Sequence, residues 1–268
     1  MNISDINIYP IKSLAGVTVD SALVEDRGLQ FDRRWMLVDW KRKFITQREV
    51  PRMAAVKIAV VGDGLTASID GNTIAIPAHP ATGKTATVKI WSSSVKAEFY
   101  PDEINHWFSN LLETGCRLVL MPETTKRKVN PFYAVRRFED TVSFADGYPF
   151  LLIGEGSLEE LNSRLERPVP MNRFRPNFVV AGSEPFAEDD WRRIRIGSSE
   201  FYVVKPCGRC VITTVDQATG KIDGKDPLKT LSTFRNRNGK VLFGQNLIAH
   251  ATGGTIRNGD DVEVLERK

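Results

Sequence analysis

Short stretches of β-branched and aromatic residues alternate with turn sequences over the first hundred residues. Such stretches are typical of β-strands. They cover residues 6–9, 36–38, 56–60 and 88–91. Turns rich in Gly, Asp and Asn separate them, as at residues 62–64 and 70–72. Many short strands joined by tight turns favour an antiparallel barrel or sandwich in this half of the chain.

Three later segments have the spacing and the end signals of helices. Apolar residues recur at the spacing of one helical face over residues 104–112. Ser157 and Glu160 have the spacing of a capping box, so a second helix is predicted to begin at Ser157. Asp226 as N-cap and Pro227 in the first turn predict a third helix.

Strand-like stretches dominate the second half as well. They cover residues 116–121, 177–180, 192–196, 200–205, 211–215 and 262–265. Residues 123–147 are polar and have no clear period, which is typical of a functional loop or a domain connection. The chain is also long for one domain. We therefore predict an α+β fold that is predominantly β, with two domains at residues 1–122 and 123–268, the first a barrel or sandwich and the second mixed, with strands dominant and a few helices.

The charge balance is mildly basic. The 268 residues include 37 Lys and Arg against 33 Asp and Glu, a formal net charge of +4. This suits an anionic small ligand better than a nucleic acid, which needs a denser basic stripe. Taken alone, the basic cluster at residues 126–128 is best interpreted as a solvated loop. We therefore expect no nucleic-acid partner.

The sequence gives no indication of a membrane or an oxidising compartment. No apolar run approaches the roughly 18–20 residues that cross a bilayer, and residues 1–5 do not resemble a secretion signal. Three cysteines are too few for a disulfide framework. We expect a cytoplasmic protein without a membrane partner.

The sharpest local feature is the sequence Cys207-Gly208-Arg209-Cys210. A thioredoxin-like pair needs a helix after it, but residues 211–215 predict a strand. A zinc site needs a second pair of ligands, and the remaining cysteine and the histidines are scattered singly. A single soft thiolate ligand to a metal, favoured by Arg209, and two inert buried cysteines both stay open.

Basic and amide side chains also stand beside predicted strand ends. Guanidinium and amide groups make directional hydrogen bonds to phosphates and polar heterocycles. Taken singly, each of these residues is better explained as a surface charge or a structural hydrogen bond. The residues are Lys12, Ser13, Arg33, Arg175 and Asn177.

Six segments resemble a known family, in the same order along the chain. Residues 205–216 look like the signature of the MOSC domain, the C-terminal module of molybdenum cofactor sulfurases. The other segments are residues 9–13, 31–33, 143–149, 174–177 and 243–246. The first two resemble the β-barrel domain that precedes MOSC in the mitochondrial amidoxime reducing component and its bacterial YcbX-like relatives. The resemblance implies that residues 123–268 are a MOSC β-barrel domain.

The same resemblance implies roles for particular residues. Cys210 would ligate molybdenum and be the catalytic residue. The resemblance carries no ligand role over to Cys207, which we place among the cofactor-binding residues because it neighbours Cys210 in the motif. The pterin and its phosphate would be held by Lys12, Ser13, Arg33, Arg175 and Asn177. The cofactor cleft would be lined by Asp146, Gly147 and Tyr148.

The activity that the resemblance implies is a two-electron reduction dependent on the molybdenum cofactor. The substrates would be hydroxylamino-purines, amidoximes and hydroxylamines, reduced from N–O to N–H with release of water. MOSC domains are also associated generically with pyridoxal phosphate, a cofactor that we do not expect here. The alternative function is a non-catalytic carrier of the cofactor or of sulfur. The N-terminal barrel with Lys12 and Arg33 favours the reductase, because small stand-alone MOSC proteins lack it.

The resemblance also implies a separate electron-donor protein, a flavin or Fe–S reductase. Bacterial relatives often continue into a ferredoxin domain, whose [2Fe–2S] cluster needs four cysteine ligands. This chain has three cysteines in total. We therefore expect no Fe–S cluster in this chain.

Overall fold

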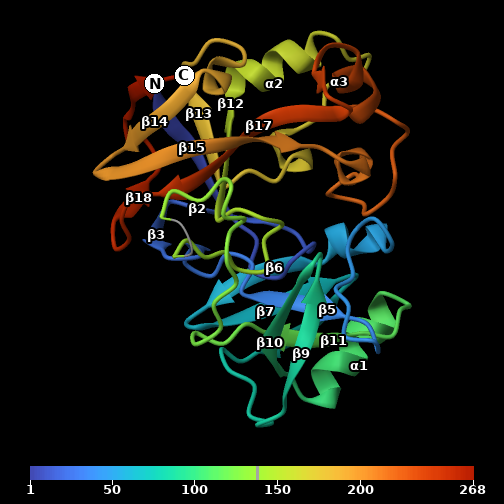
Figure 1. Ribbon diagram of the computed structural model, residues 1–268. Coiled ribbons are helices and arrows are strands. Elements are labelled where there is room, and N and C mark those ends of the chain that lie inside the picture. The colour runs from blue at the N-terminus through green and yellow to red at the C-terminus, as the bar shows by residue number, and fades with distance from the viewer. Residues whose placement is uncertain (137–138) are drawn as a thin grey trace.

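The computed structural model describes residues 1–136 and 139–268. Two β-rich bodies lie one above the other, with both chain ends in the upper one (Figure 1). The chain begins in the upper body, builds the lower one and then returns. The sequence prediction of an α+β, predominantly β fold is confirmed.

A nine-stranded sheet forms the upper body, in the order β19-β14-β15-β17-β12-β13-β1-β2 with β16 beside β17. Its strands are β1 (Asn2–Ile8), β2 (Val17–Val19), β12 (Phe150–Gly154), β13 (Phe178–Ala181), β14 (Trp191–Ile196), β15 (Ser199–Gly208), β16 (Asn236–Arg237), β17 (Lys240–Ala249) and β19 (Val262–Arg267). A small sheet of β18 (Thr255–Arg257), β3 (Ser21–Glu25) and β4 (Gly28–Leu29) adjoins it. Helices α2 (Glu155–Asn162) and α3 (Leu228–Phe234) lie at its upper end (Figure 1).

Two further sheets and one helix form the lower body. The four-stranded sheet has β5 (Trp35–Val38), β11 (Arg117–Leu120), β10 (Ser93–Phe99) and β9 (Thr85–Ile90). The three-stranded sheet has β6 (Lys57–Val61), β7 (Gly64–Ile69) and β8 (Asn72–Ile76). Helix α1 (Asp102–Leu111) follows. Its apolar face buries Ile104 and Phe108 in one core with alternate residues of β7, as the periods of 3.6 and 2 require.

The first strand belongs to the sheet of the second half of the chain. Strand β1 runs antiparallel to β13, pairing Ile6 with Phe178, and β2 pairs with its other edge. The buried Ile3 and Ile6 share a core with Phe178 and Phe201. The residues that follow β1 are therefore fixed where the two bodies meet. The division at residue 122 stays a prediction.

The described residues also form four short 3₁₀ helices: η1 (Pro51–Ala55), η2 (Met171–Arg173), η3 (Ala187–Asp189) and η4 (Val211–Thr214). The strand predicted at residues 211–215 is wrong, because η4 occupies that segment. The Thr213 and Thr214 hydroxyls donate to the carbonyls of Cys210 and Val211. Such local bonds from threonine to the backbone compete with strand pairing.

The predicted start of α2 is also wrong. The helix begins at Glu155, and Ser157 lies inside it. The Ser157 hydroxyl lies 2.8 Å from both carboxylate oxygens of the buried Glu188 and accepts the Phe186 N–H. Burial raises the pKa of Glu188. A buried carboxyl needs hydrogen-bond donors more than an exposed helix end does.

The long connection from β11 to β12 contains no helix or strand in its described part. The interpretation of residues 126–128 as a solvated basic loop is wrong for Arg127, which is 6% exposed. Its guanidinium donates to the carbonyls of Ser143, Ala145 and Asp146 at 2.9, 2.5 and 2.8 Å. Because one planar group joins three carbonyls, it fixes the turn that carries Asp146.

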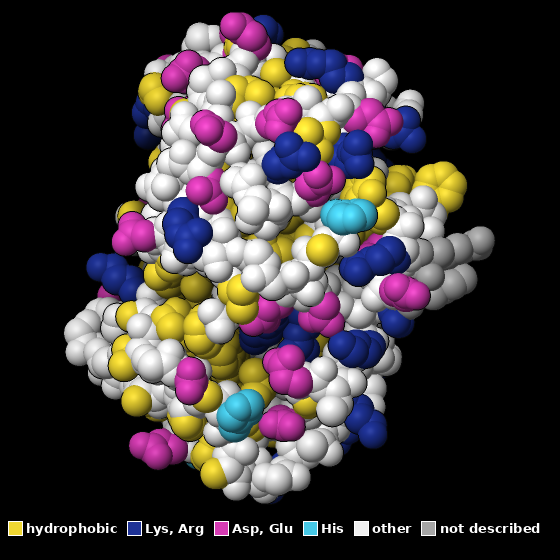
Figure 2. Space-filling model, turned by 90° about the vertical axis from the view of Figure 1, so that its left-hand side faces the viewer, with side chains coloured by type: hydrophobic (Ala, Val, Ile, Leu, Met, Phe, Trp, Pro, Cys, Tyr) yellow, Lys and Arg dark blue, Asp and Glu magenta, His cyan; other side chains and the backbone are white. Residues whose placement is uncertain are grey.

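The surface shows a mixture of charges. On the face drawn in Figure 2, described basic side chains are interspersed with acidic ones and with apolar patches. No helix in the described residues combines the length and apolar character needed to cross a bilayer.

Two glycines of the β16–β17 region allow a matched stability test. Both have left-handed backbones, with φ of 73° at Gly239 and 78° at Gly244. A Cβ at Gly239 meets nothing within 4 Å, whereas at Gly244 it would lie 2.6 Å from Ile153 Cγ1 and 2.9 Å from the Leu152 carbonyl oxygen. We expect Gly239→Ala to cost about 1 kcal/mol from backbone strain. Gly244→Ala should cost about 1–3 kcal/mol more from overpacking.

Urea unfolding of both variants measures this difference. Equal losses for the two would show that Ile153 and Leu152 move aside without cost.

Candidate functional site

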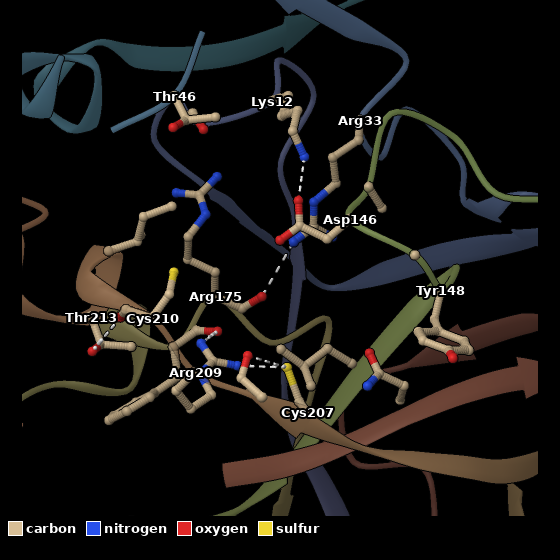
Figure 3. A pocket seen from close by; sticks show the side chains of 18 of the residues that line it. Lys12, Arg33, Thr46, Asp146, Tyr148, Arg175, Cys207, Arg209, Cys210 and Thr213 are labelled. Carbon is tan, nitrogen blue, oxygen red and sulfur yellow. Dashed lines mark hydrogen bonds and ion pairs between the residues drawn. The ribbon is translucent and has the colours of Figure 1, made fainter. Parts of the chain in front are cut away.

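One pocket contains all ten residues predicted for the site. It has a volume of about 810 Å³, including its open mouth, and loops from both bodies line it (Figure 3). The predicted residues in its lining are Lys12, Ser13, Arg33, Asp146, Gly147, Tyr148, Arg175, Asn177, Cys207 and Cys210. Positions separated by almost 200 residues in the sequence thus meet in space.

Three of these residues have unusual backbones. Ser13, Arg33 and Arg175 have φ values of 67°, 50° and 56°. Residues with a Cβ seldom adopt this left-handed region, which costs of order 1 kcal/mol each. Such strain is maintained where the surrounding structure needs a particular side-chain direction. Here it directs three polar side chains into one pocket.

The ring of Tyr9 supports two of the guanidinium groups. The central carbons of Arg33 and Arg175 each lie 4.2 Å from its centroid, a favourable cation–π distance. The Tyr9 hydroxyl donates to the Pro176 carbonyl at 3.1 Å. Burial raises the pKa of Tyr9 to about 12, although both arginines oppose this. The ring is therefore neutral and can lie between charges of one sign.

Arg33 is held by other protein groups. Its Nη1 donates to Asp32 at 2.6 Å and to Asn177 Oδ1 at 3.1 Å, and its Nη2 donates to the Arg175 carbonyl at 3.3 Å. Asn177 is 1% exposed, and its amide also bonds the backbones of Leu151 and Asn7. Arg33 and Asn177 thereby fix the shape of the pocket wall. Their contact with a cofactor stays a prediction.

Lys12 and Asp146 form an ion pair across the pocket. Lys12 Nζ lies 2.5 Å from Asp146 Oδ1, and the Trp91 indole N–H donates to the same oxygen at 3.2 Å. Burial lowers the pKa of Lys12, although Asp146 opposes the change. Burial alone would raise the pKa of Asp146, but the charge and hydrogen bond of Lys12 outweigh it and lower the value. Asp146 is therefore ionised at neutral pH.

The two cysteines of the motif have different partners. Cys207 lies on β15, and Arg209 Nη1 donates to its sulfur at 3.1 Å while Nη2 donates to the Phe174 carbonyl at 2.6 Å. Cys210 follows the strand, and its sulfur lies 3.5 Å from Arg48 Nη2. Both are free thiols that are partly exposed to the pocket. The sequence predicted that Arg209 would place a positive charge beside a thiolate ligand. In the structure Arg209 contacts Cys207, and the guanidinium beside Cys210 belongs to Arg48.

A site for zinc or another ion held by clustered ligands is not indicated. Among the described residues, no group of three or more His, Cys, Asp or Glu side chains could hold a metal ion. A thioredoxin-like pair is also not indicated, because the segment after Cys210 is the single turn η4 rather than a long helix. Of the interpretations of the Cys207–Cys210 motif, a single thiolate ligand agrees best with a thiol that faces a pocket.

Sequence reasoning missed several residues of the pocket wall. Arg48 and Thr46 line the pocket. Trp91 reaches its rim from the β9–β10 turn, and Gln47 pairs with Gln217 across the junction of the two bodies. The one available signal was the capping-box spacing of Thr46 and Glu49, which the hydrogen bonds of this turn confirm.

The pocket is strongly cationic. Five basic residues line it against one carboxylate, Asp146; they are Lys12, Arg33, Arg48, Arg175 and Arg209. Within residues 1–136 and 139–268, Arg48 and Arg175 form no ion pair with a carboxylate. Unpaired guanidinium groups bind phosphate well, and a thiolate binds a soft metal. This set of donors therefore fits a ligand that carries both a phosphate and a thiophilic metal.

Comparison with known proteins agrees with this geometry. Residues 1–115 match the MOSC N-terminal beta barrel domain, and residues 139–263 match the MOSC domain. Mitochondrial amidoxime-reducing component 1 of Mus musculus is 36% identical over 96% of this chain and 80% of its own length. The Homo sapiens protein of the same name is 33% identical over 96% and 81%.

More distant similarities also exist. A molybdenum cofactor sulfurase of Oryza sativa subsp. japonica is 30% identical over 91% of this chain but 32% of its own length. The solved structure of the YuaD protein from Bacillus subtilis covers 97% of this chain and is itself covered to 92%, with a TM-score of 0.44 and 10% identity.

The Lys12–Asp146 pair predicts a pH-dependent stability. Because the pKa of Asp146 is lowered from its ordinary 3.8, its stabilising effect is present above pH 3.8 and is lost as the pH falls below that value. At pH 7, Asp146→Asn leaves Lys12 buried without a counter-ion. This should cost about 1–2 kcal/mol, since Asp146 itself is open to solvent.

Urea unfolding gives the free energy of unfolding of wild type and of Asp146→Asn between pH 7 and pH 3. The difference between the two proteins should become smaller below pH 4. Adding Lys12→Met to Asp146→Asn should recover part of the loss. A difference in free energy of unfolding that stays constant with pH would contradict the ionised pair.

Proposed function

Because this chain belongs to the amidoxime-reducing component family of MOSC proteins, we propose that it is a molybdenum-cofactor-dependent reductase of N-hydroxylated compounds. Its substrates are amidoximes, hydroxylamines and hydroxylamino-purines, which it converts from N–O to N–H with release of water. The observation that carries this proposal is the Cys210 thiol facing a pocket lined by five basic residues. The cofactor has both a phosphate and a metal bonded to sulfur, and this pocket offers partners for each.

Different residues of the pocket hold different parts of the cofactor. Cys210 is the protein ligand of the metal. Arg175, Lys12 and Ser13 bind the phosphate end, since Arg175 has no carboxylate partner in the described chain. Asp146, Gly147 and Tyr148 line the cleft, and Cys207 lies beside the metal ligand. The cofactor, when bound, supplies the two-electron chemistry.

The protein itself supplies position and charge. Tyr9, Asp32 and Asn177 hold the guanidinium groups of Arg33 and Arg175 in place before any ligand arrives. Such preorganised donors gain more from a buried anion than flexible surface lysines do. Arg127 fixes the backbone beneath Asp146, so the two walls of the cleft keep their spacing.

In this proposal the electrons are supplied by a donor protein that carries a flavin or an Fe–S cluster. A [2Fe–2S] cluster of the ferredoxin kind takes four cysteine ligands. This chain has three cysteines, of which Cys116 is fully buried and the other two line the pocket. The three free thiols support a reducing compartment such as the cytoplasm.

The rival function is a carrier that holds the cofactor or sulfur without turnover. The similarity to a molybdenum cofactor sulfurase favours this reading. Against it, Lys12 and Arg48, which lie before the MOSC domain in the sequence, complete the pocket around the thiol. Turnover with a chemical reductant separates the two functions.

Replacing the predicted metal ligand tests the proposal directly. Cys210→Ala should reduce amidoxime turnover to background with a reduced dye as donor, because the metal loses its protein thiolate. Cys207→Ala should lower turnover by about tenfold or less, the effect of a residue next to a ligand. Circular dichroism and urea unfolding of both variants check the fold. Full activity in Cys210→Ala would falsify the assignment.

Replacing Arg175 tests the phosphate subsite. Arg175→Ala should lower the molybdenum content of purified protein by about 10-fold or more, because a charge-assisted contact to the phosphate is lost. Turnover per bound molybdenum should change little. The matched control is Arg167→Ala, since Arg167 is exposed and pairs with Asp223 away from the pocket. An unchanged molybdenum content in Arg175→Ala would argue against a clamping role.

A further inference from the structure

Arg48 lines the pocket but has no contact assigned to it in the proposed binding of the cofactor. Its Nη2 lies 3.5 Å from the sulfur of Cys210, and its Nη1 lies 3.4 Å from the Thr46 hydroxyl. Within the described residues no carboxylate pairs with it. Arg48 thus has no carboxylate in direct contact, although its charge helps to lower the pKa of Asp146 across the pocket, and it lies beside the sulfur of Cys210, the proposed metal ligand. Figure 3 shows Cys210 and Asp146 in the same pocket.

The protein holds Arg48 firmly on two sides. Its guanidinium carbon lies 4.7 Å from the centroid of the Trp91 ring. Trp91 itself has a left-handed backbone, with φ of 52°, and donates its N–H to Asp146. Such a backbone is a genuine outlier for so bulky a residue. Strain of this kind at a pocket rim indicates a functional constraint on the position of the ring.

The backbone that carries Arg48 is equally constrained. Glu49 accepts hydrogen bonds from the N–H and the hydroxyl of Thr46, which closes the turn. Gln47 donates to the Ser13 carbonyl at 2.8 Å and exchanges amide hydrogen bonds with Gln217 at 3.0 and 3.2 Å. The turn is therefore tied to the other body beside Arg48. The guanidinium is preorganised rather than free to search for a partner.

We propose that Arg48 is a substrate-binding catalytic residue whose guanidinium donates hydrogen bonds to the oxygen of the N–O group. This inference rests on the proposed function. Cys210 would hold the metal end of the cofactor and Arg175 its phosphate end, so a cation at the Cys210 thiol lies where the reacting group would bind. The other cationic residues of the pocket hold the cofactor. Arg48 binds the substrate instead, by donating hydrogen bonds to the oxygen of a neutral N-hydroxylated compound.

The chemistry of the reaction explains the need for this cation. The N-hydroxy compound takes two electrons from the donor protein and two protons from solvent; the N–O bond breaks, an N–H bond forms, and the oxygen leaves as water. Negative charge develops on the oxygen as it separates from nitrogen. A fixed guanidinium stabilises that charge without giving up a proton.

The test compares Arg48→Met, Arg48→Lys and Arg48→Ala in cofactor-loaded protein. Benzamidoxime is the probe, and a chemically reduced dye replaces the donor protein. We expect Arg48→Met to lower kcat/KM about 100-fold, the effect of losing one such donor, while molybdenum content stays at the wild-type value. Arg48→Lys should retain part of the activity. Added guanidinium ion should restore activity to Arg48→Ala, a rescue that a purely structural role would not show.

A matched control comes from the same segment. Arg52→Met removes an exposed arginine that pairs with Asp70 outside the pocket and should leave kcat/KM unchanged. The affinity of the loaded protein for benzamidoxime, measured by calorimetry, gives a readout besides activity. It should fall in Arg48→Met and not in Arg52→Met.

The outcomes separate this inference from the proposed function. Wild-type kcat/KM and affinity in Arg48→Met would overturn the inference alone. Loss of molybdenum in proportion to activity would make Arg48 a cofactor anchor and overturn it as well. Wild-type protein that binds benzamidoxime through Arg48 without reducing it would overturn the proposed function and the catalytic role of Arg48, and would support only its contact with the N-hydroxy group. Wild-type protein that neither binds nor reduces it would overturn both.

Discussion

The pocket confines like charges to one small volume, and most of its structure can be understood as the response to that constraint. Five cationic side chains surround a cleft lined by a single carboxylate. Burial lowers the pKa of Arg175 to about 10, and the neighbouring Arg33 adds to the effect. Charges of one sign remain together in a partly buried site only if each is separately restrained. The neutral ring of Tyr9, the buried Asp32 and the Lys12–Asp146 pair supply those restraints.

The path of the chain brings these restraints to one place. Strand β1 is built into the sheet of the second half, so Tyr9 and Lys12 emerge at the junction before the lower body begins. The chain then returns through the long connection, where Arg127 binds three carbonyls and presents Asp146 opposite Lys12. The pocket is therefore a product of both bodies. Neither contains the thiol together with all of its cations.

The sequence predicts part of this and misses the rest for physical reasons. Helix α1 is predicted because its apolar residues follow the helical period, and strands β5, β9 and β13 because they are short runs rich in β-branched or aromatic residues. Residues 211–215 are misassigned, since a β-branched run can also form a turn when threonine hydroxyls bond the backbone. Spacing alone did not bring Lys12, Arg33 and Arg175 together; the family resemblance did. Arg48 stayed hidden because its role depends on Trp91 and Cys210, which are far from it in sequence.

The two cysteines have different surroundings, which supports the proposal that Cys210 is the metal ligand and Cys207 its neighbour. Cys207 lies within β15, at the irregularity between the pairs Pro206–Gln245 and Gly208–Leu242, and its sulfur already accepts a hydrogen bond from Arg209 at 3.1 Å. Cys210 lies just past the last ladder pair, Gly208 with Leu242, and its sulfur has a longer contact of 3.5 Å with Arg48. A thiolate freed from strand geometry and held less tightly by its cation has more capacity to bond a metal. The end of β15 thus leaves the sulfur of Cys210 available to a metal. The sulfur of Cys207 stays hydrogen-bonded to Arg209, because the Phe174 carbonyl holds the Arg209 guanidinium in place.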